Sequence, residues 1–217
     1  GHFAKMVLDA LECVMFQSIG DAFAYANGNI PVVLSLMDKA MHMDITGPVI
    51  ERSKSQLYVT RNYLDVAQTK NTTAWFMEYA FKTRTPTPVV HAAINARTSS
   101  QYAKFSETRQ KYNKFYDPNV ILQTVRFCYA MAYYECRQLS NGKVTAWVQN
   151  SNAACPMFEI HDPMVIMDTT VEYVRSFVMH CVHCGIPVPT VQAALSQYDF
   201  MKQERTSMNF IASLRNV

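Results

Sequence analysis

The sequence has little net charge and no long apolar run, and these two absences exclude several classes of protein. Its 217 residues carry a net charge of +3, which is too small to indicate a nucleic-acid or membrane-surface partner. No apolar stretch reaches the roughly 18 residues that a transmembrane helix requires. A secretory signal peptide is not predicted either, because Lys5, Asp9 and Glu12 interrupt the first apolar segment. We therefore expect a cytoplasmic protein that binds neither nucleic acid nor membrane.

Two further absences concern the fold. The sequence contains no G-x-G-x-x-G turn and no segment in which apolar and polar side chains alternate over several residues. A dinucleotide-binding Rossmann domain and β-strands are therefore not predicted. No internal repeat or linker divides the chain, so we predict an all-α fold with a single helical domain over residues 1–217. Because the chain begins with Gly1 instead of Met, we expect this domain to be part of a longer polypeptide.

Helical periodicity and capping residues divide the chain into successive helices. Apolar side chains recur every three or four residues between Gly and Pro breaks. Asp117-Pro118 and Asp162-Pro163 each place a capping carboxylate before a proline at the first helical position. Thr72 or Thr73 is expected to cap a further helix. The expected helices cover residues 1–28, 32–43, 49–66, 74–82, 89–112, 118–139, 163–184, 190–201 and 207–214.

Most of the six cysteines lie within apolar helical patterns, and we expect reduced, buried thiols in a cytosol-like compartment. They are Cys13, Cys128, Cys136, Cys155, Cys181 and Cys184. One local cluster, residues 180–184 with the sequence His-Cys-Val-His-Cys, has a spacing that a zinc site on a helix uses. No second group of ligands accompanies it, and the surrounding pattern is that of a buried apolar helix. We therefore predict no metal site.

The first expected helix carries a polar face beside its apolar stripe. Spaced at i, i+3, i+4 and i+7, this face consists of Lys5, Leu8, Asp9 and Glu12. An amine and a carboxylate two turns apart, roughly 10 Å along the axis, are suited to flank a small substrate. The spacing alone is also typical of a solvated stripe on an amphipathic helix, and it favours that second interpretation.

Short motifs along the chain resemble those of one protein family. The opening GHFAKMVLDALE, residues 1–12, resembles a G-H-F-x-K-M-V-x-x-x-x-E pattern, and residues 96–100 resemble A-R-x-S-S. Residues 185–199 are similar to G-I-P-x-P…A-L-S-x-Y-D, and residues 208–215 to A-N-L-I…R. In this order and at compatible spacing, they resemble the C-terminal, all-helical domain of the 6-phosphogluconate dehydrogenases.

The resemblance implies roles for individual residues. Lys5 and Glu12 match the catalytic lysine and glutamate of the family. Asp9 matches an asparagine that lies near the nicotinamide cofactor and the substrate. Contacts with the substrate phosphate are implied for Lys70, Thr72, Arg97 and Arg215, the last reaching across from a second subunit.

Several positions depart from the family pattern. Leu8 and Asp9 replace a histidine and an asparagine, and Cys13 replaces a tyrosine that binds phosphate. The phosphate loop also differs, at Asn71, Thr73 and Ala74. A carboxylate at Asp9, one turn from Lys5, favours the ammonium form of the lysine, which opposes a role as a base.

Two functions follow from the resemblance. In the first, the chain is the substrate-binding domain of an enzyme that uses NADP to convert 6-phosphogluconate into ribulose 5-phosphate and carbon dioxide, with NADP bound only if a Rossmann domain is supplied. In the second, it is a degenerate relative that serves for dimerisation or as a scaffold in a larger protein. Both imply a homodimer, and the first implies a phosphorylated sugar acid as partner.

Overall fold

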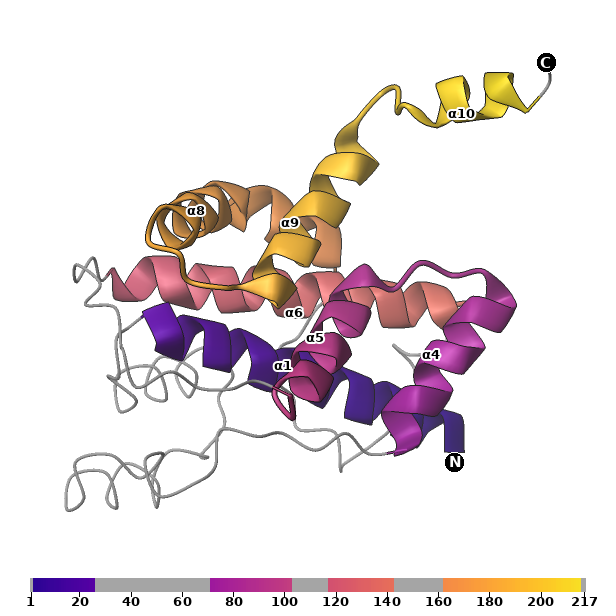
Figure 1. Ribbon diagram of the computed structural model, residues 1–217, viewed down its shortest axis with the longest axis horizontal. Helices are drawn as coiled ribbons and strands as arrows, with labels where there is room; N and C mark the ends of the chain where they lie inside the picture. The colour runs from indigo at the N-terminus through magenta and orange to yellow at the C-terminus, as the bar shows by residue number, and fades with distance from the viewer. Residues whose placement is uncertain (1, 26–70, 103–116, 143–161, 216–217) are drawn as a thin grey trace.

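The apolar periodicity of the chain produces helices throughout the part that the structure describes. The computed structural model describes residues 2–25, 71–102, 117–142 and 162–215. Within these ranges it contains seven α-helices and no strand, which confirms the predicted all-α fold (Figure 1). The helices are α1 (His2–Tyr25), α4 (Asn71–Thr83), α5 (Pro88–Ser99), α6 (Pro118–Leu139), α8 (Pro163–His183), α9 (Pro189–Lys202) and α10 (Met208–Leu214).

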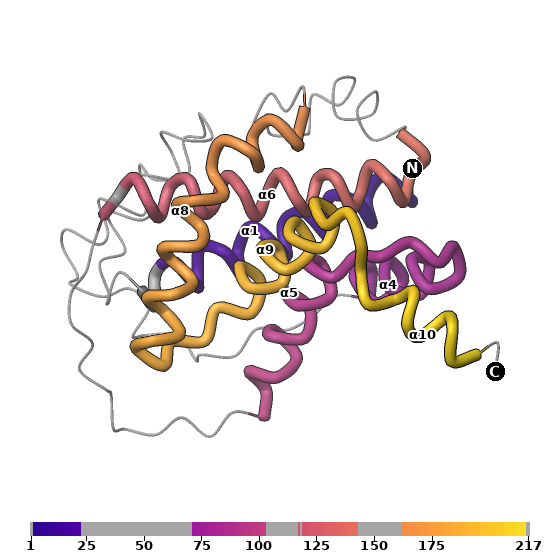
Figure 2. The backbone as a smooth tube through the Cα atoms, turned by 90° about the horizontal axis from the view of Figure 1, so that it is seen from above, coloured from indigo at the N-terminus to yellow at the C-terminus, as the bar shows by residue number. Residues whose placement is uncertain are grey.

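The central helix of the described part is α6. It packs between α8 on one side and α1 on the other, as Figure 1 shows. In addition, α1 packs against α4 and α5, α5 also contacts α6, and α9 contacts α1, α5, α6 and α8 (Figure 2). One apolar core joins these helices and includes Leu11, Phe76, Phe127, Met131 and Phe177. This packing places α1 against α4, α5, α6 and α9 while leaving Lys5 and Glu12 on its polar face exposed.

Two helix starts follow directly from the sequence. Asp117 and Asp162 are extended residues whose carboxylates accept hydrogen bonds from the backbone amides of Asn119 and Met164, both at 2.9 Å. Each is followed by a proline at the start of the helix, where a missing N–H costs nothing. The predicted starts of α6 and α8 are thereby confirmed.

Two predicted boundaries are wrong. The helix expected over residues 89–112 ends at Ser99, in a turn where Ser100 Oγ donates to the Arg97 carbonyl at 2.7 Å. Hydroxyl side chains in this segment compete for backbone groups and weaken the helix. Thr72 and Thr73 are also not caps, because α4 begins at Asn71 and both threonines are buried in its first turn.

Several predicted features fall outside the residues that the structure describes. The helices expected over residues 32–43 and 49–66, and also Lys70 and Cys155, fall outside the described residues. The break expected after residue 139 is confirmed by Asn141 and Gly142, which have φ values of 52° and 81°. Each of the five described cysteines is a thiol outside any disulfide, and four of them are buried, as expected.

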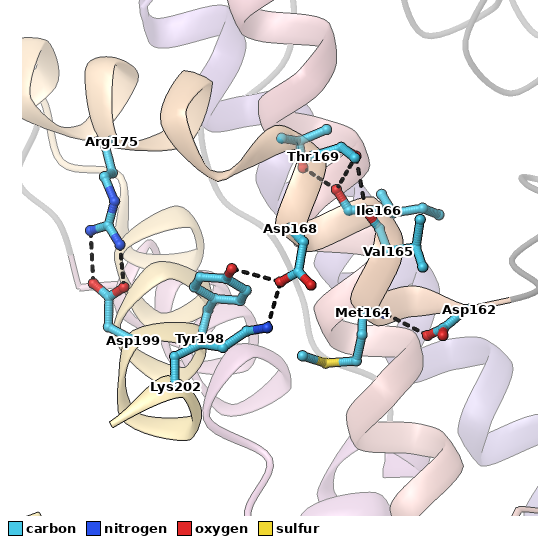
Figure 3. A network of polar contacts seen from close by, with 11 residues as sticks. Asp162, Met164, Val165, Ile166, Asp168, Thr169, Arg175, Tyr198, Asp199 and Lys202 are labelled. Carbon is cyan, nitrogen blue, oxygen red and sulfur yellow. Dashed lines mark hydrogen bonds and ion pairs between the residues drawn. The ribbon is translucent and has the colours of Figure 1, made fainter. Parts of the chain in front are cut away.

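The last helices differ sharply in how they pack. Figure 3 shows α8 joined to α9 by polar contacts. Arg175 binds Asp199 through two hydrogen bonds of 3.0 and 2.5 Å, and Asp168 accepts from Tyr198 and Lys202 at 2.7 Å each. In contrast, α10 projects away from the other helices, and none of its residues is buried (Figures 1 and 2).

Candidate functional site

The polar face of α1 forms as its spacing predicts. Lys5 Nζ lies 3.1 Å from Asp9 Oδ2 and 3.4 Å from Asp9 Oδ1, one helical turn away. The lysine side chain is 59% exposed, whereas that of Asp9 is 10% exposed. Glu12 is exposed on the same face, and Leu8 is half-buried. An incoming anion must therefore compete with Asp9 for the Lys5 ammonium.

Aromatic contacts with α4 position the N-terminal end of α1. The ring of His2 lies 4.8 Å from that of Trp75, and Phe3 meets Tyr79 edge to face at 5.4 Å. Edge-to-face pairs of this kind add stabilisation beyond the area that they bury. They hold the turn of α1 that carries Lys5 against α4, whose first turn contains the buried Thr72.

The packing of α5 on α1 brings a second predicted residue to this site. The half-buried Arg97, in the last turn of α5, lies beside the buried thiol of Cys13 in α1. Burial raises the pKa of Cys13, and a hydrogen bond and the positive charge of Arg97 partly offset this effect. This contact places Arg97 beside α1, the helix that also carries Lys5 and Glu12.

The remaining predicted residues are not all brought together. Arg215 caps the exposed end of α10, away from α1. Lys70 lies outside the described residues, so the predicted phosphate loop is described only from Asn71 onward. Within one copy of the chain, Lys5, Asp9 and Glu12 share one face of α1, Arg97 lies beside Cys13 of the same helix, and Arg215 is remote.

Sequence reasoning missed two buried carboxylates. Asp21 in α1 and Glu135 in α6 are 3% and 1% exposed. Burial raises the pKa of Asp21 to about 7 and that of Glu135 to about 8, with hydrogen bonds opposing the rise in each case. The helical spacing of the sequence could have indicated their burial. Asp21 follows the buried Ser18 by three residues, and Glu135 follows the buried Ala132 by three residues, so each lies at the edge of the buried stripe of its helix.

The described residues contain no group of three or more potential metal ligands. In the predicted His-Cys-Val-His-Cys segment, Cys184 Sγ lies 3.5 Å from His180 Nε2, and Cys181 is buried in the core. Among the described helices, none is long and apolar enough to cross a membrane.

Comparisons with known proteins agree on one family. A family model described as "6-phosphogluconate dehydrogenase, C-terminal domain" matches residues 1–135. Two curated relatives, both "6-phosphogluconate dehydrogenase, decarboxylating", come from Lactococcus lactis subsp. lactis (strain IL1403) and subsp. cremoris (strain MG1363). They are 23% and 22% identical over 272 residues, which cover 100% of this chain and 57% of each relative. The chain therefore spans little more than half the length of these relatives.

A solved structure supports the same fold. It is Plasmodium falciparum 6-phosphogluconate dehydrogenase, studied in its apo form, with its cofactor NADP+ and with its substrate 6-phosphogluconate. The two folds superpose with a TM-score of 0.71 at 17% sequence identity, over 98% of this chain and 57% of that one.

Proposed function

Since this chain belongs to the 6-phosphogluconate dehydrogenase family, we propose that it is the substrate-binding helical domain of an NADP-dependent decarboxylating dehydrogenase. Its substrate is a phosphorylated sugar acid, 6-phosphogluconate or a close relative, which is oxidised and loses carbon dioxide to give ribulose 5-phosphate. Residues 1–217 form one domain in this proposal.

The observation that carries the proposal is the position of Arg97 beside α1. Its guanidinium lies next to Cys13, one residue after Glu12 and on the helix that carries Lys5. Guanidinium groups bind phosphate oxygens in a bidentate manner. We propose that a phosphorylated sugar acid binds with its phosphate at Arg97 and its sugar chain over the polar face of α1.

The residues have distinct roles in this proposal. Lys5 transfers a proton to and from the substrate hydroxyl, and Glu12 protonates the enediol that remains after decarboxylation. Phosphate binds to Arg97, with Lys70 and Thr72 contributing from the segment around the start of α4. Arg215 completes the phosphate site of a second copy of the chain, because α10 projects away from its own body.

The described residues do not by themselves fit NADP. They contain no strand, and so no strand–turn–helix unit with glycines at the turn that could hold the pyrophosphate. The proposal therefore assigns the cofactor to a dinucleotide-binding domain outside this chain. In that arrangement Asp9 lies near the nicotinamide, and its carboxylate binds Lys5.

A second candidate function is a catalytically degenerate domain used for dimerisation or as a scaffold. The ion pair between Lys5 and Asp9 favours it, because the pair occupies the amine that the chemistry needs. Exposed apolar side chains of α10 support self-association, and they are Met208, Phe210, Ile211 and Leu214. In both candidates we propose a homodimer in the cytoplasm, a compartment that suits the five described cysteines, which are free thiols.

Calorimetric titration with 6-phosphogluconate tests the first candidate. We expect Arg97→Ala to weaken binding about tenfold, which corresponds to roughly 1.4 kcal/mol. Arg137→Ala, at an exposed arginine in the last turn of α6, is the matched control and leaves binding unchanged. Asp9→Asn removes the competing carboxylate, and we expect binding to become roughly two- to fivefold tighter, the range for an exposed ion pair.

The same titration separates the two candidates. If the unsubstituted protein releases no heat at millimolar 6-phosphogluconate, the substrate proposal fails. Analytical ultracentrifugation then decides the second candidate, which requires a dimer that dissociates when residues 204–217 are removed. A monomer in both forms would contradict the scaffold role as well.

A further inference from the structure

Two helices begin against a buried carboxylate that comes from another helix. The N-cap residues of α5 and α9, Thr87 and Val188, make no capping hydrogen bond through their side chains. Glu135 of α6 faces the start of α5, and Asp21 of α1 faces the start of α9. At both helix starts, a carboxylate from a distant part of the sequence thus faces the backbone N–H groups that have no partner within the helix.

At the start of α5 this arrangement is complete. Glu135 Oε1 accepts a hydrogen bond from the Val89 amide at 2.9 Å, and Oε2 accepts one from the Val90 amide at 3.2 Å. Neither oxygen of this buried carboxylate lacks a partner. The glutamate side chain is long enough to cross from α6 to the backbone of α5.

At the start of α9 the arrangement is incomplete. Asp21 is one methylene shorter than glutamate, and its Oδ1 accepts from Gln17 Nε2 at 2.6 Å. The amides of Thr190 and Val191 face the carboxylate and favour its charge. Nevertheless, Asp21 Oδ2 is buried and has no hydrogen-bond partner in the described structure. The shorter side chain leaves one oxygen of the carboxylate unused.

Two buried hydroxyl groups at this junction also lack a hydrogen-bond partner among the described residues. Ser18 lies one turn before Asp21 on the same face of α1, beside the Cys128 thiol of α6. Thr190 lies in the first turn of α9. These residues are 2% and 0% exposed, and neither hydroxyl oxygen has a hydrogen-bond partner of suitable geometry within the described ranges. Buried polar atoms without partners are rare in folded proteins, and a buried water molecule commonly satisfies them.

We propose that one buried water molecule occupies the junction between α1 and α9 and joins the Asp21 carboxylate to the start of α9 through the hydroxyls of Ser18 and Thr190. A water molecule donates to Asp21 Oδ2 and to one hydroxyl oxygen, and accepts from the other hydroxyl or from a backbone amide. Three such bonds are the usual number for a buried water. The water thus gives the second carboxylate oxygen of Asp21 a hydrogen-bond partner, as the backbone amides of α5 do directly for Glu135.

The surroundings favour water over a metal cation. The start of α9 presents N–H donors and the positive end of a helix dipole, which disfavour a cation. Within the described ranges, the thiols of Cys128 in α6 and Cys181 in α8 are the titratable groups that interact with Asp21. Burial raises the pKa of both to about 12, so they remain neutral and supply no further negative charge.

High-resolution crystallography of the protein, together with oxygen-17 relaxation dispersion in solution, tests this proposal. We expect density for one water within hydrogen-bond distance of Asp21 Oδ2 and of at least one of the two hydroxyls. Asp21→Glu supplies the missing methylene, so the longer carboxylate reaches the α9 amides directly and one long-lived water is lost. Direct contact between Asp21 Oδ2 and the α9 amides in the unsubstituted protein, with no water between, would overturn the proposal.

The reciprocal substitution is the matched control. Glu135→Asp shortens the carboxylate at α5, and we expect it to create a corresponding water site there. Thermal unfolding separates hydration from simple packing: Asp21→Ala lowers the Tm by roughly 5 °C, whereas Asp21→Glu changes it by less than about 2 °C. A Tm that rises with sodium or potassium chloride but not with tetramethylammonium chloride would indicate a cation and contradict the proposal. If the variants do not fold, the structure of the unsubstituted protein still decides.

Discussion

Burial of Glu135 and Asp21 makes individual carboxyl groups important for stability. In the folded protein their pKa values are about 8 and 7, above the ordinary values of 4.5 and 3.8. Desolvation is the main cause in both cases. The nearby thiols carry no positive charge that would lower these pKa values; they are Cys136 beside Glu135, and Cys128 and Cys181 near Asp21. Between the two sets of values the folded state binds more protons than the unfolded state. The contribution of these two groups to the free energy of unfolding therefore falls as the pH rises from about 4 to 8.

Replacing Glu135 with glutamine removes one of these titrations. We expect the free energy of unfolding of Glu135→Gln to depend less steeply on pH between about 4.5 and 8, by up to roughly 1.4 kcal/mol per pH unit. Urea unfolding followed at several pH values measures this slope. Glu204→Gln, at an exposed position, is expected to keep the slope of the unsubstituted protein. Equal slopes for Glu135→Gln and the unsubstituted protein would mean that Glu135 titrates normally in the folded state.

Among helices, the Asp-Pro starts are the clearest link between sequence and structure. Asp117 and Asp162 were predictable because an N-cap acts within its own turn, and both accept the expected backbone hydrogen bond. The end of α5 at Ser99 was not, because apolar spacing continues past it while hydroxyl side chains bind the last carbonyls. Local chemistry thus predicts these two helix starts but not the end of α5.

The cap of α8 offers a direct test at this scale. We expect Asp162→Ala to lower the free energy of unfolding by about 1 kcal/mol, because the Met164 amide loses its acceptor. Asp162→Asn retains an acceptor oxygen and should change stability by only a few tenths of a kcal/mol. Urea denaturation measures both. A loss of the same size in both variants would show that charge, and not the hydrogen bond, stabilises the start of α8.

At the scale of the whole molecule, contacts between distant segments decide what the sequence leaves open. The spacing of Lys5 and Asp9 was sufficient to predict their common face, because both belong to one helix. No local pattern places Arg97 beside Cys13, or Glu135 at the amides of residues 89 and 90, about 45 residues away along the chain. Only the packing of α5 on α1 and α6 creates these neighbours. The common face of Lys5 and Asp9 was therefore predictable from spacing, whereas the position of Arg97 beside Cys13 was not.

The ion pair between α8 and α9 is a contact between two helices whose strength can be measured. A double-mutant cycle of Arg175→Ala and Asp199→Ala should give a coupling of about 0.5–1 kcal/mol, since the pair is bidentate but each side chain is more than a third exposed. Raising the salt concentration should reduce this coupling. A cycle of Lys82→Ala and Glu78→Ala, an exposed pair within α4, provides the comparison and should give less. Additive losses for Arg175 and Asp199 would exclude any contribution of the pair to the docking of α9.

The exposed position of α10 has a consequence for proteolysis. Seven residues are too few for a helix that is stable without packing, and none of those in α10 is buried. The segment before it contains Arg205, which is exposed. A trypsin-like protease that cuts after this arginine would release α10 together with Arg215 and leave the packed helices intact. Protection of this bond in the native assembly would therefore report that another surface covers the tail.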